Sequence, residues 1–222
     1  RRQKQQRRNE GHEINHKKIQ RLMRKEGLVC VQRKKRRYSS YKGTVGKIAD
    51  NLINRDFTAE KANEKWFTDV TEFHLGTEKC YLSPILDACG QEIVAWNTSV
   101  SPNLDQVHDM LRKAYQANPN LKGTILHSDQ GWQYQHKSYA ESLKKHGIIQ
   151  SMSRKGNSMD NGLMENFFGI LKCEMFYGQE SKYRDIRDLM SAIDHYIHYY
   201  NEQRIKVKLK GRTPSQFRSS SL

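Results

Sequence analysis

The amino-acid sequence predicts an α/β fold in which a mixed β-sheet is followed by helices and preceded by a small basic helical arm. Two observations support this fold class. Short segments with strand character alternate with helix-periodic segments in the middle of the chain. Most of the positive charge lies at the N-terminus, where residues 1–40 carry +12 of the net charge of +15 of the 222 residues. A chain of this length allows one full domain with a smaller appendage.

The N-terminal part is expected to contain one helix. Residues 1–14 are predicted to be a disordered basic tail, because residues 1–13 have no apolar side chain to bury. A basic helix follows within residues 15–37, where Asn15 can cap the first turn and apolar residues recur at helical spacing. Its other face carries basic side chains that can contact phosphates, although a solvated charged face is the alternative. These candidate DNA-binding residues are Lys17, Lys18 and Arg21.

The middle of the chain contains the predicted sheet. Residues 38–64 are expected to be a turn-rich linker to a catalytic core over residues 65–180. The expected strands and helices, in order, are strands 65–73, 80–88 and 92–100, a helix after Asn103, a strand over 124–128, a helix over 136–146 and a strand from 148. The order β-β-β-α-β-α-β is that of the RNase H-like sheet.

The C-terminal third is predicted to be helical. A polar loop at 151–160 precedes a helix over 161–176, and a longer helix over 184–201 follows. Thr213 and Pro214 form an N-cap and first-turn pair for a last short helix. We expect residues 181–222 to be a helical extension of the core.

Composition excludes several classes of protein. No run of 18 apolar residues and no signal-peptide core are present, so we expect a soluble, cytoplasmic protein. The four cysteines are far apart, which indicates neither a disulfide framework nor a zinc ribbon. Because the sequence begins with Arg1 rather than methionine, we expect an upstream part to be missing.

Three acidic residues occupy positions that folding alone does not favour. Asp69 lies within a predicted strand, where a buried aspartate is costly without a cation or hydrogen bonds. Asp129 follows a predicted strand at the edge of the sheet where α/β proteins bind ligands. Glu165 lies in the first turns of the helix after the polar loop.

The residues around these acids resemble the DDE transposases of bacterial insertion sequences, in particular the OrfB type, whose catalytic core is related to retroviral integrase. The similarity is carried by WFTDVTEF around Asp69, LHSDQGWQYQ around Asp129 and SRKGNSMDNGLMENFFGILKCE around Glu165. It extends from about residue 15 to residue 217. Family members have further helices upstream, so residues 15–37 would be the remnant of a helix-turn-helix region.

The resemblance implies metal-dependent DNA strand cleavage and strand transfer. Three acids can hold two Mg²⁺ ions, with Mn²⁺ as a substitute, and such a pair can activate a nucleophile and stabilise a leaving oxygen. By this resemblance Asp69 would bridge the ions, and Asp129 and Glu165 would each bind mainly one. Lys172 lies two helical turns after Glu165, where the family has a basic residue near the DNA ends.

Neighbouring residues are expected to support the site. Asn161 is expected to position other groups or cap the helix, with direct DNA contact as the alternative. Gln130 is expected to shape the DNA channel. For Trp132 and Tyr134, packing and channel lining remain equal alternatives. His127 is expected to be packed or hydrogen-bonded. In the loop before Glu165 stand two candidate phosphate contacts, Arg154 and Lys155, for which a solvated loop charge is the alternative.

The expected partners are the DNA of the element ends and of the target, further copies of the chain on DNA, and a protein from an upstream reading frame. A catalytically idle DNA-binding fragment that regulates transposition is an alternative function, and a stand-alone RNase H-like nuclease is another. The intact acid triad argues against the first alternative, and Lys172 with the extent of the similarity argues against the second.

Overall fold

A mixed sheet forms the centre of the molecule in the computed structural model, which describes residues 1–29 and 46–221. In this part of the chain the sheet has six strands. They are β1 (Lys65–Thr68), β2 (Thr71–Leu75), β3 (Glu78–Asp87), β4 (Glu92–Ser99), β5 (Ile125–Ser128) and β6 (Ile149–Met152). β3 pairs antiparallel with β4 on one side and with β1 and β2 on the other, and β1, β5 and β6 are parallel neighbours. The RNase H-like mixed sheet predicted from the sequence is confirmed.

The first predicted strand, over residues 65–73, is interrupted. β1 and β2 lie end to end along β3, and Asp69 and Val70 separate them. The two short strands therefore take the place of the single predicted strand, and the interruption falls at Asp69, a candidate catalytic residue.

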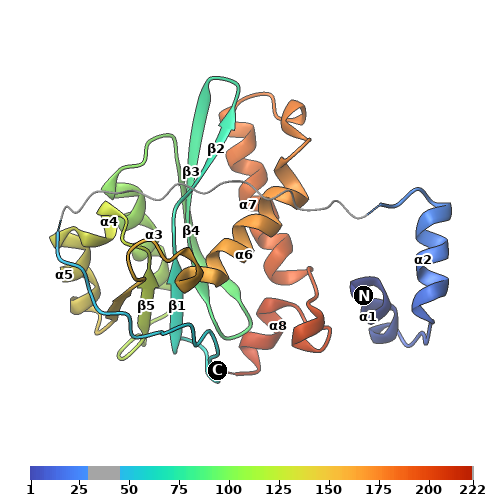
Figure 1. Cartoon of the computed structure of the whole chain (residues 1–222), viewed down its shortest axis with the longest axis horizontal. Helices are drawn as coiled ribbons and strands as arrows, with labels where there is room; N and C mark the ends of the chain where they lie inside the picture. Colours follow the sequence, from blue (N-terminus) through green and yellow to red (C-terminus); the bar gives the residue numbers. More distant parts are fainter. Residues whose placement is uncertain (30–45, 222) are drawn as a thin grey trace.

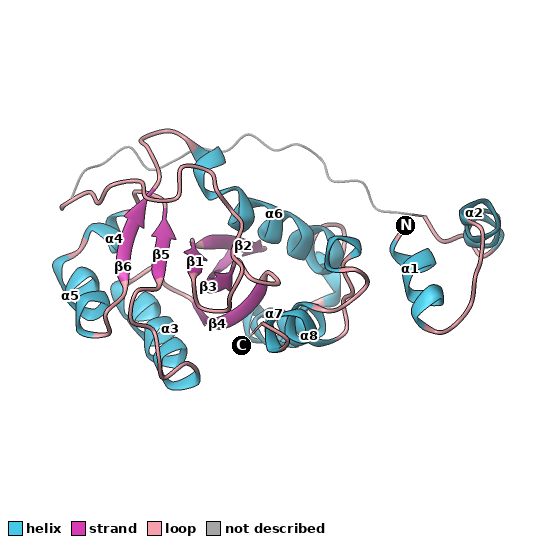
Figure 2. Ribbon diagram, turned by 90° about the horizontal axis from the view of Figure 1, so that it is seen from below, coloured by secondary structure: helices cyan, strands magenta, loops and turns pink. Residues whose placement is uncertain are grey.

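Helices cover both faces of the sheet (Figures 1 and 2). On one face lie α3 (Leu104–Ala117), α4 (Trp132–Gln135) and α5 (Lys137–Lys145), and on the other α6 (Gly162–Leu171) and α7 (Ile186–Glu202), with α8 (Pro214–Ser219) beside α7. Each face has its own apolar core. Consecutive side chains of β1 enter different cores: Phe67 packs with the α6–α7 core and Trp66 with the α3–α5 core.

Side-chain caps mark the starts of α3 and α8. Asn103 Oδ1 accepts the backbone N–H of Gln106 over 3.0 Å at the start of α3. Thr213 and Gln216 form a capping box at α8, with Pro214 in the first turn, as the Thr-Pro pair predicts.

The helix predicted over residues 161–176 is divided into three parts. A 3-10 turn (Ser158–Asn161) precedes α6, and a π-helical turn (Lys172–Phe176) follows it. Met175 and Phe176 are consecutive buried residues, and the ring of Phe176 lies edge-on to that of Phe73 at 5.1 Å. The wider turn allows both side chains to enter the core. Shorter 3-10 turns occur at Glu180–Lys182 and Val207–Leu209.

The N-terminal arm contains two helices, α1 (Arg2–Asn9) and α2 (His16–Lys25). The prediction of a disordered tail over residues 1–14 is therefore wrong for α1. Its arginine, lysine and glutamine residues are good helix formers, and polar contacts hold it to the core. Arg2 forms an ion pair with Glu174 at 3.4 Å, and Asn9 Nδ2 donates to the carbonyl of Gly211 over 2.8 Å.

Two further predictions concern segments around the arm. The basic run over residues 33–37 and the first part of the predicted linker, up to residue 45, lie outside the described residues. Residues 46–64 contain no helix or strand, in line with the predicted turn-rich connection, but they are bonded to the core at several points. Within the described ranges, no helix is long and apolar enough to cross a membrane.

Candidate active site

Asp69 lies at the interruption between β1 and β2. The backbone N–H of Val70 donates to Asp69 Oδ1 over 2.8 Å. Burial, and next the charge of Asp129, raise the pKa of Asp69 well above the usual value of a carboxyl. Asp69, which was expected inside a strand, thus follows the end of β1 and lies outside the regular pairing with β3.

Asp129 reaches the same edge of the sheet from β5. β1 and β5 are parallel, and Phe67 is paired with His127; Asp69 and Asp129 come two residues later in their strands. The N–H of Gly131 donates to Asp129 Oδ1 over 2.9 Å, and burial raises the pKa of the Asp129 carboxyl. A Cβ at residue 131 would lie 2.7 Å from Gln133 Nε2 and 2.9 Å from that oxygen, so a larger residue here would displace these side chains.

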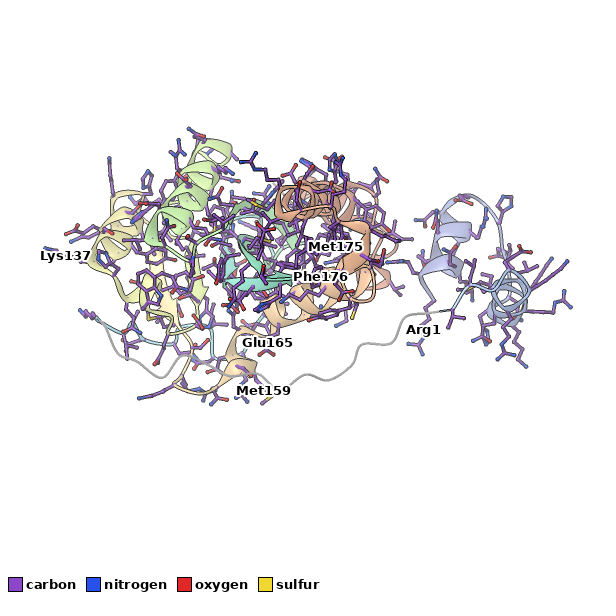
Figure 3. All side chains as sticks on the ribbon, turned by 90° about the horizontal axis from the view of Figure 1, so that it is seen from above. Arg1, Lys137, Met159, Glu165, Met175 and Phe176 are labelled. Carbon is purple, nitrogen blue, oxygen red and sulfur yellow. The ribbon has the colours of Figure 1, made fainter. Side chains whose placement is uncertain are left out.

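Glu165 and Lys172 approach Asp69 from α6 and from the π-helical turn that follows it. Glu165 is in the first turn of α6, at the edge of the core in Figure 3. Its charge raises the pKa of Asp69, whereas the charge of Lys172 lowers it, so both act on Asp69 through space. Lys172 Nζ donates to the carbonyl of Glu72 over 2.7 Å and lies 4.8 Å from the centre of the Phe73 ring. This contact fixes the lysine against β2.

The three acids do not form a closed ligand set. Among residues 1–29 and 46–221, no three histidine, cysteine, aspartate or glutamate side chains form a group that could hold a metal ion as they stand. Asp129 raises the pKa of Asp69 more than Glu165 does. The structure therefore brings the two aspartates together and places Glu165 within electrostatic reach of Asp69.

Two amide side chains connect the segments that carry the acids. Asn161 Nδ2 donates to the carbonyl of Thr68 over 3.0 Å, joining the start of α6 to the residue before Asp69. Asn161 makes no side-chain capping bond to α6, so the capping role predicted for it is not present. Gln130 Nε2 donates to the carbonyl of Ser153 over 2.9 Å and connects the end of β5 to the loop after β6.

The loop before α6 is organised by Asp160, which the sequence analysis did not identify. Its carboxylate is fully buried and accepts hydrogen bonds from Nε and an Nη of Arg154, each at 2.8 Å. These bonds outweigh burial and hold the pKa of Asp160 below its usual value. Arg154, predicted to contact phosphate, is thus bound to Asp160 with its side chain 53% exposed, and Lys155 is exposed. No local sequence signal pointed to Asp160, because its arginine partners are recognisable only in the fold.

The histidine and the tyrosine near Asp129 have structural roles. His127 is fully buried and its ring nitrogens are hydrogen-bonded to Ser151 Oγ at 2.9 Å and Ser153 Oγ at 3.1 Å, as expected. Tyr134 is also fully buried and packs edge-on against Tyr139 at 5.4 Å. For Tyr134 packing is therefore the correct alternative, whereas Trp132 is only partly buried.

The candidate DNA-binding residues of the arm lie on α2. Asn15 Oδ1 accepts the N–H of Lys17 over 3.0 Å, so the predicted cap is present. Lys17, Lys18 and Arg21 are exposed. In Figure 1 α2 lies at the opposite end of the molecule from α5, so these basic residues are well separated from that side of the core.

Comparison with protein families gives three matches. The integrase core domain matches residues 59–158, and a second integrase core domain family matches residues 165–222. An HTH-like domain matches residues 1–36. The last match includes both α1 and α2, so residues 1–14 belong to the region of DNA-binding similarity that the sequence analysis confined to residues 15–37.

The chain is also similar to individual proteins. It is 51% identical to an "Uncharacterized transposase-like protein" of Haemophilus influenzae, over 94% of this chain and 95% of that protein. It is 47% identical to InsK, a transposase assigned to insertion sequence element IS150 of Escherichia coli, over 96% of this chain and 74% of InsK.

Solved structures of low identity share the fold. The HTLV-2 integrase catalytic core domain in complex with magnesium is 18% identical, with a TM-score of 0.56 over 71% of this chain and 97% of that one. A chain of the simian T-cell lymphotropic virus intasome is 17% identical, with a TM-score of 0.62 over 78% of this chain and 57% of that one. Taken with the sequence matches, this shows that the chain belongs to the family of insertion-sequence transposases with an integrase core domain.

Proposed function

We propose that this chain is a DDE transposase that cleaves DNA strands and transfers them in a metal-dependent reaction. The family is one of DNA transposases and integrases, which implies polynucleotidyl transferase activity. The observation that supports the assignment most is the Asp69–Asp129 pair, which two parallel strands bring to one edge of the sheet. Glu165 and Lys172 act on Asp69 from α6 and the turn after it.

The residues of the site fit a hard divalent cation. Burial raises the pKa of Asp69 and of Asp129, because a buried carboxylate loses the solvation of its charge. A neighbouring cation would offset this loss and favour the ionised form. Carboxylate oxygens are the ligands that Mg²⁺ prefers, and Mn²⁺ would substitute for it. Asp69, Asp129 and Glu165 would hold two such ions, with Asp69 shared between them and Asp129 and Glu165 each binding mainly one. When bound, such a pair activates the attacking oxygen and offsets the charge that develops on the phosphate and the leaving 3′ oxygen.

The other residues bind and position. Lys172 presents a cation beside the acids, held by the carbonyl of Glu72, and would bind a phosphate of the DNA end. Asn161 fixes the spacing between the segments of Asp69 and Glu165. Arg154 and Lys155, on the loop before α6, would contact the DNA backbone through the exposed parts of their side chains.

We propose that the arm supplies general affinity for DNA. Its exposed basic residues Lys17, Lys18 and Arg21 would contact phosphates, which fix orientation without determining sequence. On DNA the chain would assemble with further copies of itself and with a protein from an upstream reading frame. With DNA as its partner, we place it in the bacterial cytoplasm, at the nucleoid. We retain the division into arm, linker, core (65–180) and C-terminal extension as part of this proposal.

The catalytic assignment is tested by strand transfer in Mg²⁺ with DNA carrying the ends of the element. Asp69→Asn, Asp129→Asn and Glu165→Gln should each abolish joining of a 3′ hydroxyl to a target phosphodiester while leaving DNA binding intact. Asp109→Asn is the matched control, because Asp109 lies on α3 with its side chain 47% exposed. Near-normal joining by all three site variants would refute the assignment.

The arm is tested by the salt dependence of DNA binding. Replacing Lys17, Lys18 and Arg21 together with glutamine should weaken binding to all sequences alike. If all three contact phosphates, the slope of log K against log salt should fall by about 2.7, at about 0.9 per contact. An unchanged slope would rule out phosphate binding by these residues.

A further inference from the structure

The segment before β1 is bonded along the edge of the core that carries the candidate active site. The N–H of Leu52 donates to Ser151 Oγ over 2.9 Å, and the N–H of Met152 donates to the carbonyl of Asp50 over 3.3 Å. Ile53 is 2% exposed in the α6–α7 core. In Figure 1 this part of the chain passes from the α5 side of the molecule towards β1. The segment therefore has a fixed path, although a linker was predicted here.

Arg55 connects this segment to the loop before α6. Its Nε donates to Asp160 Oδ1 over 2.8 Å, and an Nη donates to Asn157 Oδ1 over 3.0 Å. Asn51 Nδ2 donates to the other carboxylate oxygen of Asp160 over 3.1 Å. Two side chains of the segment thus bind the same buried carboxylate.

The backbone adopts an unfavourable conformation to make this contact. Asn54 and Arg55 have φ angles of 48° and 66°, in the left-handed region. For an arginine this costs about 1 kcal/mol or more and persists only where the surroundings impose it. Asn51 Oδ1 accepts the N–H groups of Ile53 and Asn54, at 3.1 and 3.0 Å, and holds the turn. The turn held by Asn51 therefore places the Arg55 side chain against Asp160.

Asp160 lies next to the start of α6, the helix that carries Glu165. It directly precedes Asn161, which is bonded to the carbonyl of Thr68 beside Asp69. α6 begins at Gly162, and Glu165 is in its first turn. The ring of Phe57, further along the same segment, also lies against this start, since a Cβ on Gly162 would be 3.6 Å from it.

We propose that Arg55 is a positioning residue, which sets the start of α6 and thereby the place of Glu165 relative to Asp69. The segment between the DNA-binding arm and the sheet thus takes part in building the metal site. This inference rests on the proposed function, because it assumes that Glu165 shares a cation with the aspartates.

The test compares Arg55→Gln with Arg112→Gln in the complete chain. Arg112 is a matched control, because it forms an exposed ion pair with Asp109 at 2.7 Å on α3. Two quantities are measured: Mn²⁺ affinity without DNA, and hydrogen exchange of residues 157–165 without metal. Arg55→Gln should weaken Mn²⁺ binding about tenfold, as loss of groups that orient ligands does, and should speed exchange in this segment. Arg112→Gln should change neither.

A purely structural role would lower thermal stability and leave Mn²⁺ affinity unchanged, and this result would overturn the proposal. Arg55→Lys keeps the charge but cannot form both bonds, so it should give an intermediate affinity. If Arg55→Gln does not fold, the Lys variant decides: an affinity equal to that of the parent chain would refute the inference. Asp129→Asn separates the two proposals. If Asp129→Asn binds Mn²⁺ as tightly as the parent chain does, the proposed metal site is refuted. If Asp129→Asn weakens Mn²⁺ binding and Arg55→Gln does not, only the positioning role is refuted.

Discussion

Replacing Asp129 with asparagine should make the metal-free protein more stable while removing its activity. Asparagine keeps the shape of the side chain, and its Oδ1 can still accept the N–H of Gly131. The main change is therefore the loss of one negative charge. Burial, and next this charge, raise the pKa of Asp69 in the parent chain, which means that the charge of Asp129 opposes ionisation of the buried Asp69 carboxyl.

The gain should be about 1–2 kcal/mol in the free energy of unfolding, within the range of roughly 0.5–2 kcal/mol that single stabilising substitutions commonly give. For a chain of this size it corresponds to a rise in Tm of about 2–8 °C. Urea unfolding in EDTA should show a higher midpoint with an unchanged m-value. Asp109→Asn, the exposed control, should change stability by no more than about 0.5 kcal/mol.

Mg²⁺ should reverse the order of stability. A cation that binds only the folded parent adds about 2.7 kcal/mol at a hundredfold excess over its dissociation constant, and the variant should gain little. If Asp129→Asn is less stable than the parent in EDTA, or if Mg²⁺ stabilises both proteins equally, the idea of two repelling carboxylates that await a cation is wrong.

Three further perturbations test other parts of the structure. Asn161→Ala should cost about 1–3 kcal/mol in urea unfolding, because the buried carbonyl of Thr68 loses its donor; no loss would mean that this bond is not needed. Arg218→Met should cost about 3–5 kcal/mol, since the fully buried Asp87 loses the cation at 2.8 Å, and an unchanged Tm would contradict this. Burial lowers the pKa of His127 from 6.5 to about 4. Stability should therefore fall by up to roughly 3 kcal/mol as the pH drops from 6.5 to 4, and urea unfolding of His127→Asn should lack this loss.

The position of Asp129 could be predicted because it depends on a local pattern. The apolar run before Asp129 marks a strand, and its end lies at the edge of the sheet where α/β proteins bind ligands. Asp69 was expected inside a strand, and only the resemblance to the transposase family joined it to Asp129. The caps at Asn15, Asn103 and Thr213 were also predictable, since each depends on residues within one turn.

The interruption at Asp69 and the helix at the N-terminus depend on other information. The chain around Asp69 has the composition of a strand, and only the bond from Val70 and the pairing with β3 show where the strand stops. α1 has no apolar face, so a hydrophobic pattern cannot reveal it. It is held by contacts of Arg2 with Glu174 and of Asn9 with Gly211, more than 170 positions away.

The position of Glu165 shows why the site is harder to predict than the sheet. A β-strand fixes its end residue through a ladder of backbone bonds, whereas a helix start can tilt unless side chains hold it. Here the side chains that hold it, Asn161 and Asp160, are bonded to Thr68 and Arg55, residues at least 93 positions earlier in the chain. The third acid therefore depends on polar contacts between distant segments. This is the part of the site in which a substitution remote from the carboxylates should alter metal binding without altering the sheet.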